Sequence, residues 1–297
     1  LQETLLLAEK TGATVQLSHF IFVGRRSWST VDKALDLVDA ARARGVDVMI
    51  DAFPYTCGNT TILAPVPYWF LANIPAAYSS AVMRARLRLE LAVGFRLLGF
   101  NYPDFQVMDS GIPGCEDING LRITEIAAQW HCSPFSAMLT LAEKSRGATL
   151  MLFHTYSGEP GFEEPLERVL ARDDCLFETD AAIKLDGLPN PAAKGAFPRI
   201  LGRLVRDRKL FSLEEAVRRM THASAARFGL QDVGCLAPGK AADLVLFDPR
   251  TIADNPGEGR QAAGRPAGIR QVLINGQTVV EKGQYIAGVR PGRVLKA

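Results

Sequence analysis

The sequence lacks most of the features that mark nucleic-acid-binding, membrane-spanning or disulfide-rich proteins. Its 34 basic and 32 acidic residues leave a formal net charge of only +2, so composition indicates neither nucleic acid nor a charged membrane surface as a partner. No apolar run is long enough to span a bilayer. The five cysteines are scattered, without a C-x-x-C pair, which predicts reduced thiols and a cytoplasmic location.

An initiator methionine and a signal-peptide pattern are also missing. Residues 1–10 instead have the pattern of a helix inside a domain, because Leu5, Leu6 and Ala8 lie among charged side chains. We therefore expect a processed or truncated chain whose fold begins upstream of residue 1. Its 297 residues, 47% of them hydrophobic, are still enough to bury a core.

Strand patterns alternate with helix patterns along the chain. Gly45 is a usual helix end, and Ser212 with Glu215 fits a capping box. Alternation of this kind predicts parallel strands, and four such units make half of an eight-stranded (β/α)8 barrel, the TIM barrel. The expected strands cover residues 13–17, 46–50, 149–153 and 175–177, and the expected helices cover residues 31–44, 162–171 and 213–228.

Two segments depart from the alternating pattern. Residues of about 63–147 form a long insertion, expected either as a lid over the active-site face or as packing against the flank of the barrel. After Gly229 the chain becomes β-rich, and Asn275-Gly276 is a strong hairpin signal. We therefore expect residues 1–228 to form a partial barrel with this insertion, and residues 229–297 to form a portion of a small C-terminal β-sandwich.

Each of the four expected strands runs into a histidine or an aspartate: His19, Asp51, His154 and Asp180. Chemistry in (β/α)8 barrels takes place at the C-terminal ends of the strands. His19 could be a zinc ligand, although a lone histidine is more often structural. Asp180 could bind a metal and take a proton from water, or it could cap a turn. For His154 we favour a contact with substrate over metal binding.

A histidine and an aspartate at strand ends suit a metallohydrolase. A catalytic zinc ion normally has three protein ligands and one open position. His19 and Asp180 are too few for such a site, so the remaining ligands are expected upstream of residue 1.

Several motifs resemble a known family. Residues 234–249, GCLAPGKAADLVLFDP, are similar to the tail signature of the amidohydrolases, and Ile274-Asn275-Gly276 resembles the hairpin that follows it. Five more motifs resemble the N-acyl-D-amino-acid deacylase (D-aminoacylase) branch, as its C-terminal portion, so that the resemblance covers nearly the whole chain. These motifs are QLSH (16–19), GRRSW (24–28), DAFPYT (51–56), GAFPR (195–199) and RPGRVL (290–295).

This resemblance implies a hydrolase that uses one or two zinc ions to cleave the C–N bond of a small-molecule amide, such as an N-acyl amino acid. It implies that His19 binds zinc, and that Asp180 is both the catalytic base and a metal contact. Tyr55 and Asn59 are expected to hold the carbonyl or the carboxylate of the substrate. A homo-oligomer is left open.

Some positions depart from this branch. Ile21 stands where the branch has a lysine, Phe53 replaces a tyrosine, and Asn59 replaces a serine. Ala192 replaces an arginine that grips the substrate carboxylate, and a small side chain cannot form that bidentate contact. We therefore expect a different, less acidic amide or a cyclic amide as substrate.

Two other functions stay open. The chain could be a non-catalytic, truncated amidohydrolase-like module, since four open strands would expose their edges and their inner face. It could also be a cyclic-amide hydrolase or a deaminase on the same scaffold, because the tail signature does not distinguish these reactions.

Overall fold

The computed structural model describes residues 1–182, 187–255, 257 and 264–295. Three strands form a parallel sheet, in which Leu17 is paired with Ile50 and Ile50 with Cys175. The strands expected in these three places are therefore confirmed. In sheet order they are β1 (Val15–Leu17), β2 (Val48–Ala52) and β6 (Cys175–Phe177).

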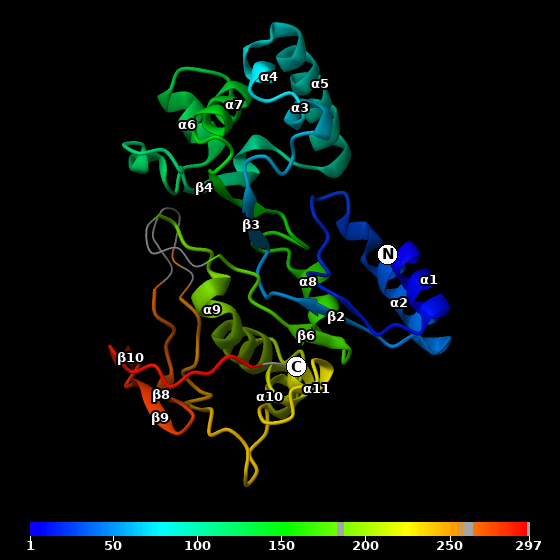
Figure 1. The fold of residues 1–297 in the computed structure, drawn as a ribbon, viewed down its shortest axis with the longest axis vertical. Helices are drawn as coiled ribbons and strands as arrows, with labels where there is room; N and C mark the ends of the chain where they lie inside the picture. The colour runs from blue at the N-terminus through cyan, green and yellow to red at the C-terminus, as the bar shows by residue number, and fades with distance from the viewer. Residues whose placement is uncertain (183–186, 256, 258–263, 296–297) are drawn as a thin grey trace.

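Helices bury their apolar faces on this sheet. In α2 (Val31–Ala43), Leu35, Val38 and Ala41 are buried at the spacing of one helix face. Figure 1 shows α1 and α2 side by side at one flank of the sheet. The same core receives side chains from α1 (Gln2–Thr11), α8 (Glu164–Leu170), α10 (Leu213–Met220) and the π-helical segment Ile200–Asp207, which continues α9 (Ala192–Arg199).

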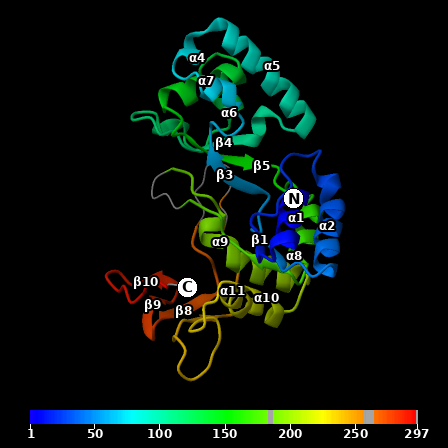
Figure 2. The same ribbon diagram turned by 45° about the vertical axis from the view of Figure 1, so that its right-hand side comes forward.

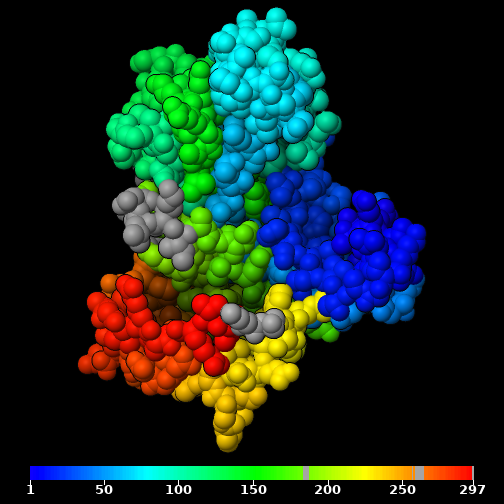
Figure 3. Space-filling model, viewed as in Figure 1, coloured from blue at the N-terminus to red at the C-terminus, as the bar shows by residue number. Residues whose placement is uncertain are grey.

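A second core lies in a lobe between β2 and α8, which we call the insertion lobe (residues 57–154). Its antiparallel sheet has the order β3 (Cys57–Thr61), β5 (Leu150–His154), β4 (Phe105–Asp109). Figures 1 and 2 show the lobe above the parallel sheet, and Figure 3 shows it as a distinct mass, coloured cyan to green. Its helices are α3 (Tyr68–Leu71), α4 (Ala76–Ser79), α5 (Ala81–Leu98), α6 (Ile123–Gln129) and α7 (Pro134–Lys144).

The strand expected at residues 149–153 forms as β5, but the prediction that it is a parallel strand is wrong. β5 pairs antiparallel with β3, where Cys57 lies opposite His154, and antiparallel with β4 on its other edge. An apolar run fits a buried strand of either kind of sheet, so its pattern does not identify its partners. The domain boundaries at 63–147 and 229–297 stay a prediction.

The C-terminal residues form one antiparallel sheet in the order β10-β9-β8-β7. Asn275 (φ 47°) and Gly276 (φ 74°) make the predicted two-residue turn, since positive φ at both positions matches the twist of a hairpin. The helix expected at residues 213–228 is instead α10 and α11 (His222–Arg227), separated at Thr221. The strands are β7 (Leu244–Phe247), β8 (Ile269–Ile274), β9 (Gln277–Glu281) and β10 (Gln284–Tyr285).

The chain is therefore a mixed α/β protein. Short 3-10 helices also occur at Trp28–Thr30, Tyr102–Asp104 and Glu116–Ile118. All five cysteines are free thiols, as the sequence predicted. Within the described residues, no helix has both the length and the apolar character needed to cross a membrane.

Candidate active site

The C-terminal ends of β1, β2 and β6 lie side by side along one edge of the parallel sheet, because these strands are parallel and in register. By the edge of this sheet we mean this line of C-terminal strand ends, and by the opposite edge the line of N-terminal strand ends. His19 comes after β1, Asp51 lies in β2, and Asp180 comes after β6. Ligands bind at this edge in proteins built from parallel strands and helices. His19 and Asp180, the predicted pair, thus follow the C-terminal ends of the two strands that flank β2.

His19 and Asp180 share an unusual backbone conformation. Both side chains are exposed, and both residues have a positive φ, 41° for His19 and 38° for Asp180. A residue other than glycine rarely adopts this left-handed conformation, because it costs free energy that the surrounding structure must supply. Strained residues of this kind are concentrated at functional sites.

Asp51 connects the strand ends. Its carboxylate is buried and accepts hydrogen bonds from the backbone N–H of His19 (2.8 Å), the side-chain amide of Gln16 (2.7 Å) and the hydroxyl of Ser18 (3.2 Å). The guanidinium of Arg227, from α11, donates to the side-chain oxygen of Gln16 at 3.1 Å. Asp51 therefore fixes the end of β1 from the neighbouring strand.

Glu178 is a functional candidate that the sequence patterns did not identify. Burial, and then the nearby carboxylates of Asp51 and Asp180, raise the pKa of Glu178 to about 8. Its Oε1 atom is buried without a hydrogen-bond partner. The one signal in the sequence is its position two residues before Asp180, at the end of an apolar strand.

Tyr55 and Asn59 take part in contacts within the chain. The hydroxyl of Tyr55 donates to Asp254 at 2.7 Å, and burial raises the pKa of this hydroxyl far above its ordinary value. The side-chain oxygen of Asn59 accepts from the amide of Asn190 (2.6 Å) and from the backbone N–H of Ala182 (3.2 Å). Asn59 thus ties the segment after Asp180 to β3. Substrate binding by Tyr55 and Asn59 stays a prediction.

His154 lies at the end of β5, in the sheet of the insertion lobe rather than at the parallel-strand edge. Its Nε2 atom is 3.0 Å from the side-chain oxygen of Gln106. Burial, and then the positive charge of Arg122, lower the pKa of His154 to about 4. If the neutral imidazole of His154 contacts substrate, that contact lies in the insertion lobe and not at the ends of the parallel strands. This role stays a prediction.

A cavity of about 410 Å³ opens in the insertion lobe. Its wall includes Val23, from the loop after β1, and Tyr156, whose hydroxyl pKa is raised by burial and then by the carboxylate of Asp180. The cavity therefore lies between the insertion lobe and the segments that contain Val23 and Tyr156. The deeper wall is apolar and includes Leu91, Phe95, Phe100, Phe105 and Phe153.

The residues present do not make a complete zinc site. His19 and Asp180 are suitable donors, one nitrogen and one oxygen. Among the residues that the structure describes, however, no three histidine, cysteine, aspartate or glutamate side chains are grouped so that they could hold a metal ion. A catalytic zinc ion normally has three protein ligands, so it would need donors other than this pair.

Comparison with known proteins finds relatives for the whole chain. The model of the Amidohydrolase family matches residues 172–280. The chain is 31% identical to N-acyl-D-glutamate deacylase of Alcaligenes xylosoxydans xylosoxydans, over 99% of this chain and 50% of that protein. It is also 31% identical to D-aminoacylase of the same organism, over 99% of this chain and 51% of that protein. The chain spans about half the length of the curated relatives it matches.

Solved structures give the same relationship. N-acyl-D-glutamate deacylase from Bordetella bronchiseptica, complexed with zinc and a phosphonate inhibitor that mimics the tetrahedral intermediate, matches with a TM-score of 0.76 and 28% identity, over 100% of this chain and 52% of that chain. A crystal structure of D-aminoacylase matches with a TM-score of 0.74 and 28% identity, over the same shares of the two chains. The predicted resemblance to the amidohydrolases, in the N-acyl-D-amino-acid deacylase branch, is confirmed.

Proposed function

We propose that this chain, which is similar to N-acyl-D-amino-acid deacylases along its whole length, forms part of a metal-dependent hydrolase that cleaves the C–N bond of a small-molecule amide. The observation that carries the proposal is the placement of His19 and Asp180, both exposed, on the two strands that flank β2. The relatives' names supply the reaction class, since they are deacylases.

In this proposal Asp180 is the general base and then the general acid. Its carboxylate takes a proton from the water that attacks the carbonyl carbon, and returns that proton to the nitrogen as the C–N bond breaks. The products are a carboxylic acid and a free amine. The exposure of Asp180 at the strand end leaves its carboxylate accessible to water and substrate.

We further propose that the complete protein binds one or two zinc ions, as the Bordetella deacylase structure contains zinc. His19 and Asp180 would contribute two donors, and other residues would have to contribute the rest, because the described residues do not supply them. The proton transfers assigned to Asp180 use only its own carboxylate, whichever residues supply the remaining zinc ligands.

The proposed substrate is an amide, or a cyclic amide, that is less acidic than the N-acyl-D-amino acids of the branch, since Ala192 stands in place of the arginine that grips the substrate carboxylate. Asp51 and Asp180 place two acidic side chains at the strand edge, and negative charge there disfavours an anionic substrate. Tyr55 and Asn59 already bond to groups of this chain. The apolar cavity could receive an acyl chain or another hydrophobic part of the substrate.

The finer architecture belongs to the same proposal. The parallel sheet with its helices would be the second half of a (β/α)8 barrel, and the sheet β10-β9-β8-β7 would be part of a β-sandwich. The protein would act in the cytoplasm without nucleic acid or membrane as a partner, and homo-oligomerisation stays open.

A substrate panel tests the proposal. The natural protein that contains these 297 residues would be assayed for amine release from N-acetyl-D-amino acids, neutral N-acyl amides and cyclic amides, with added zinc and after chelation. We expect hydrolysis that depends on zinc, and faster turnover of the neutral amides. Hydrolysis of N-acetyl-D-glutamate as fast as that of any neutral amide would contradict the substrate assignment. No hydrolysis of any amide would contradict the reaction class.

A further inference from the structure

The conformation of His19 requires an explanation within the fold. Its φ of 41° is unfavourable for a residue with a side chain. His19 is also exposed, so packing around its imidazole cannot impose this conformation. The constraint must come from hydrogen bonds to its backbone and to its neighbours in sequence.

Asp51 makes hydrogen bonds to three consecutive residues centred on His19. Its side chain accepts from the hydroxyl of Ser18 and from the backbone N–H of His19. Its backbone carbonyl accepts from the N–H of Phe20 at 2.8 Å. One residue of β2 therefore holds the chain immediately before, at and after His19.

The carboxylate of Asp51 is itself held firmly. It is only 7% exposed, and the side-chain amide of Gln16 donates to it while the guanidinium of Arg227 donates to Gln16. Hydrogen bonds to a buried carboxylate are stronger than those between neutral groups. A charged acceptor in a fixed position can therefore maintain a strained turn that neutral contacts would not.

We propose that Asp51 is a positioning residue of the candidate site: it holds His19 in the left-handed conformation that presents its imidazole at the edge of the parallel sheet. Asp51 acts through His19 and does not contact substrate. What the imidazole then does depends on the proposed function, but its placement by Asp51 does not.

The test uses the small number of histidines in the 297-residue chain. Isotope-labelled histidine gives one backbone amide signal for each of the four histidines, and hydrogen exchange measures how well each amide is protected. In the wild type, His19 donates to one carboxylate oxygen of Asp51, and Gln16 and Ser18 donate to the other. Asp51→Asn leaves a single side-chain oxygen for these donors. The four residues are His19, His131, His154 and His222.

We expect the amide of His19 to exchange at least about tenfold faster in Asp51→Asn, the size expected for loss of a hydrogen bond to a charged group. Its backbone chemical shifts should move away from left-handed values, while the other three histidines keep their signals. Asp51→Ala, which removes every side-chain acceptor, should increase the effect. If Asp51→Ala fails to fold, which the other histidines would reveal, Asp51→Asn alone decides.

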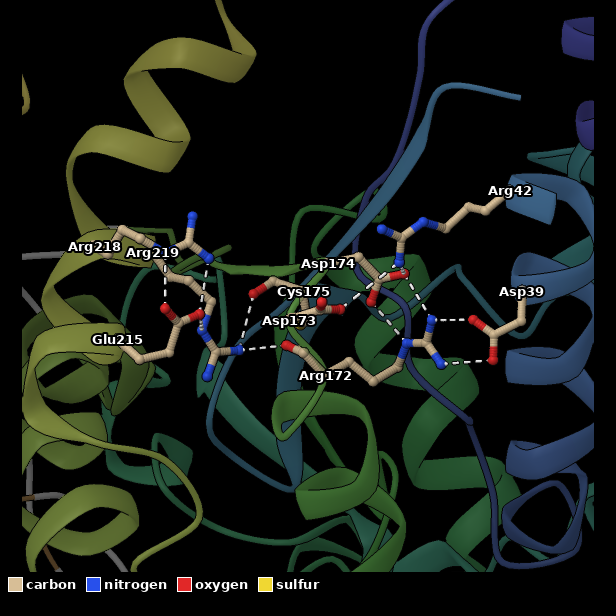
Figure 4. Close-up of polar contacts among 9 residues, drawn as sticks. All are labelled: Asp39, Arg42, Arg172, Asp173, Asp174, Cys175, Glu215, Arg218 and Arg219. Carbon is tan, nitrogen blue, oxygen red and sulfur yellow. Dashed lines mark hydrogen bonds and ion pairs between the residues drawn. The ribbon is translucent and has the colours of Figure 1, made fainter. Parts of the chain in front are cut away.

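Asp174→Asn is the matched control. Asp174 is also buried, immediately precedes β6 at the opposite edge of the sheet, and forms ion pairs with Arg42 and Arg172 (Figure 4). Its loss should lower stability without changing the signals of His19. An unchanged exchange rate of His19 in Asp51→Asn, or the same change in Asp174→Asn, would overturn the proposal. Because no substrate is used, failure of amide hydrolysis leaves this result intact, and the reverse also holds.

Discussion

The surroundings of His154 change the pKa of its imidazole. The imidazole of His154 is buried beside Gln106 and near Arg122, so its pKa falls to about 4 from an ordinary value of 6.5. His131, by contrast, is exposed. The two histidines therefore make a matched pair, one buried and one exposed.

The contribution of His154 to the stability of the protein should fall as the pH decreases from about 6.5 to about 4. In this range the unfolded chain takes up a proton at residue 154 and the folded chain does not, so protons favour unfolding; above pH 6.5 this contribution is constant. One such group changes the free energy of unfolding by at most about 1.4 kcal/mol per pH unit. Urea unfolding at several pH values would measure the slope.

His154→Gln should remove the contribution of His154 from this slope, since glutamine does not titrate, so the two slopes should differ between about pH 4 and 6.5. His131→Gln, at an exposed histidine, is the matched control for this substitution. Equal slopes in wild type and His154→Gln would show that the imidazole is not held neutral by burial.

At this scale the sequence predicted the types and places of His19 and Asp180 but not what holds them. A residue at the end of an apolar strand can be recognised from pattern alone. The bonds from Asp51 to Ser18 and His19 depend on which strands become neighbours, and the burial of Glu178 depends on packing around β6. Neither is a property of a local run of residues.

A buried arginine, as well as apolar contacts, joins helix α10 to the segments before β6. Arg219 in α10 is 1% exposed, and its guanidinium donates to the carbonyls of Leu170 (2.8 Å), Arg172 (2.6 Å) and Cys175 (3.1 Å). Its planar group also stacks on Phe177, 4.4 Å from the ring centre. Figure 4 shows the contacts of Arg219 with Arg172 and Cys175, beside Arg218 and Glu215. Arg219 thus joins α10 to the start of β6.

Arg219→Lys should therefore lower the free energy of unfolding by about 2–4 kcal/mol, because an ammonium group cannot both keep these bonds and the contact with Glu215 and present a planar face to Phe177 and Phe211. Arg218→Lys, the neighbouring change, should cost less than about 1 kcal/mol, since Arg218 forms a surface ion pair with Glu215. Denaturant unfolding of both variants checks this. A cost for Arg219→Lys no larger than that for Arg218→Lys would contradict the role assigned to α10.

The elements themselves were largely predictable, and their partners were not. Periodic segments such as α2 formed where expected, and so did the hairpin at Asn275 and Gly276, because caps and turns are encoded locally. β5 formed where expected but in the antiparallel sheet. Its pairing is decided by β3 and β4, and β4 lies about 45 residues away in sequence.

At the scale of the whole molecule, the insertion lobe is connected to the loop after β1. Arg25 in this loop donates to Asp104 (2.8 Å) in the lobe and to Glu159 (2.9 Å) beyond β5. The cavity, whose wall contains Val23 from the same loop, lies beside this connection. If the proposed function holds, the lobe and its cavity are placed to receive part of the substrate beside the loop after β1.

A larger side chain at the cavity wall should alter substrate preference. Ala64 lines the cavity and is exposed, so Ala64→Phe should reduce access without disturbing the core. We expect kcat/KM for a long-acyl amide to fall about 10-fold or more relative to that for an N-acetyl amide, as lost burial of a few CH₂ groups implies. Ala72→Phe, exposed on the same lobe away from the cavity wall, should change neither value. Equal losses for both acyl lengths would exclude the cavity as the acyl site.

The most direct test of the central claim is the rate of amide hydrolysis by the natural protein with Asp180→Asn. Asp180 is exposed, so the variant should keep its unfolding free energy while kcat falls at least about 100-fold, the loss typical of a general acid–base group. Asp173→Asn, an exposed aspartate that precedes β6 at the opposite edge of the sheet, should keep full activity. Hydrolysis that survives Asp180→Asn unchanged would contradict the assignment of Asp180 and, with it, this edge of the sheet as the catalytic site.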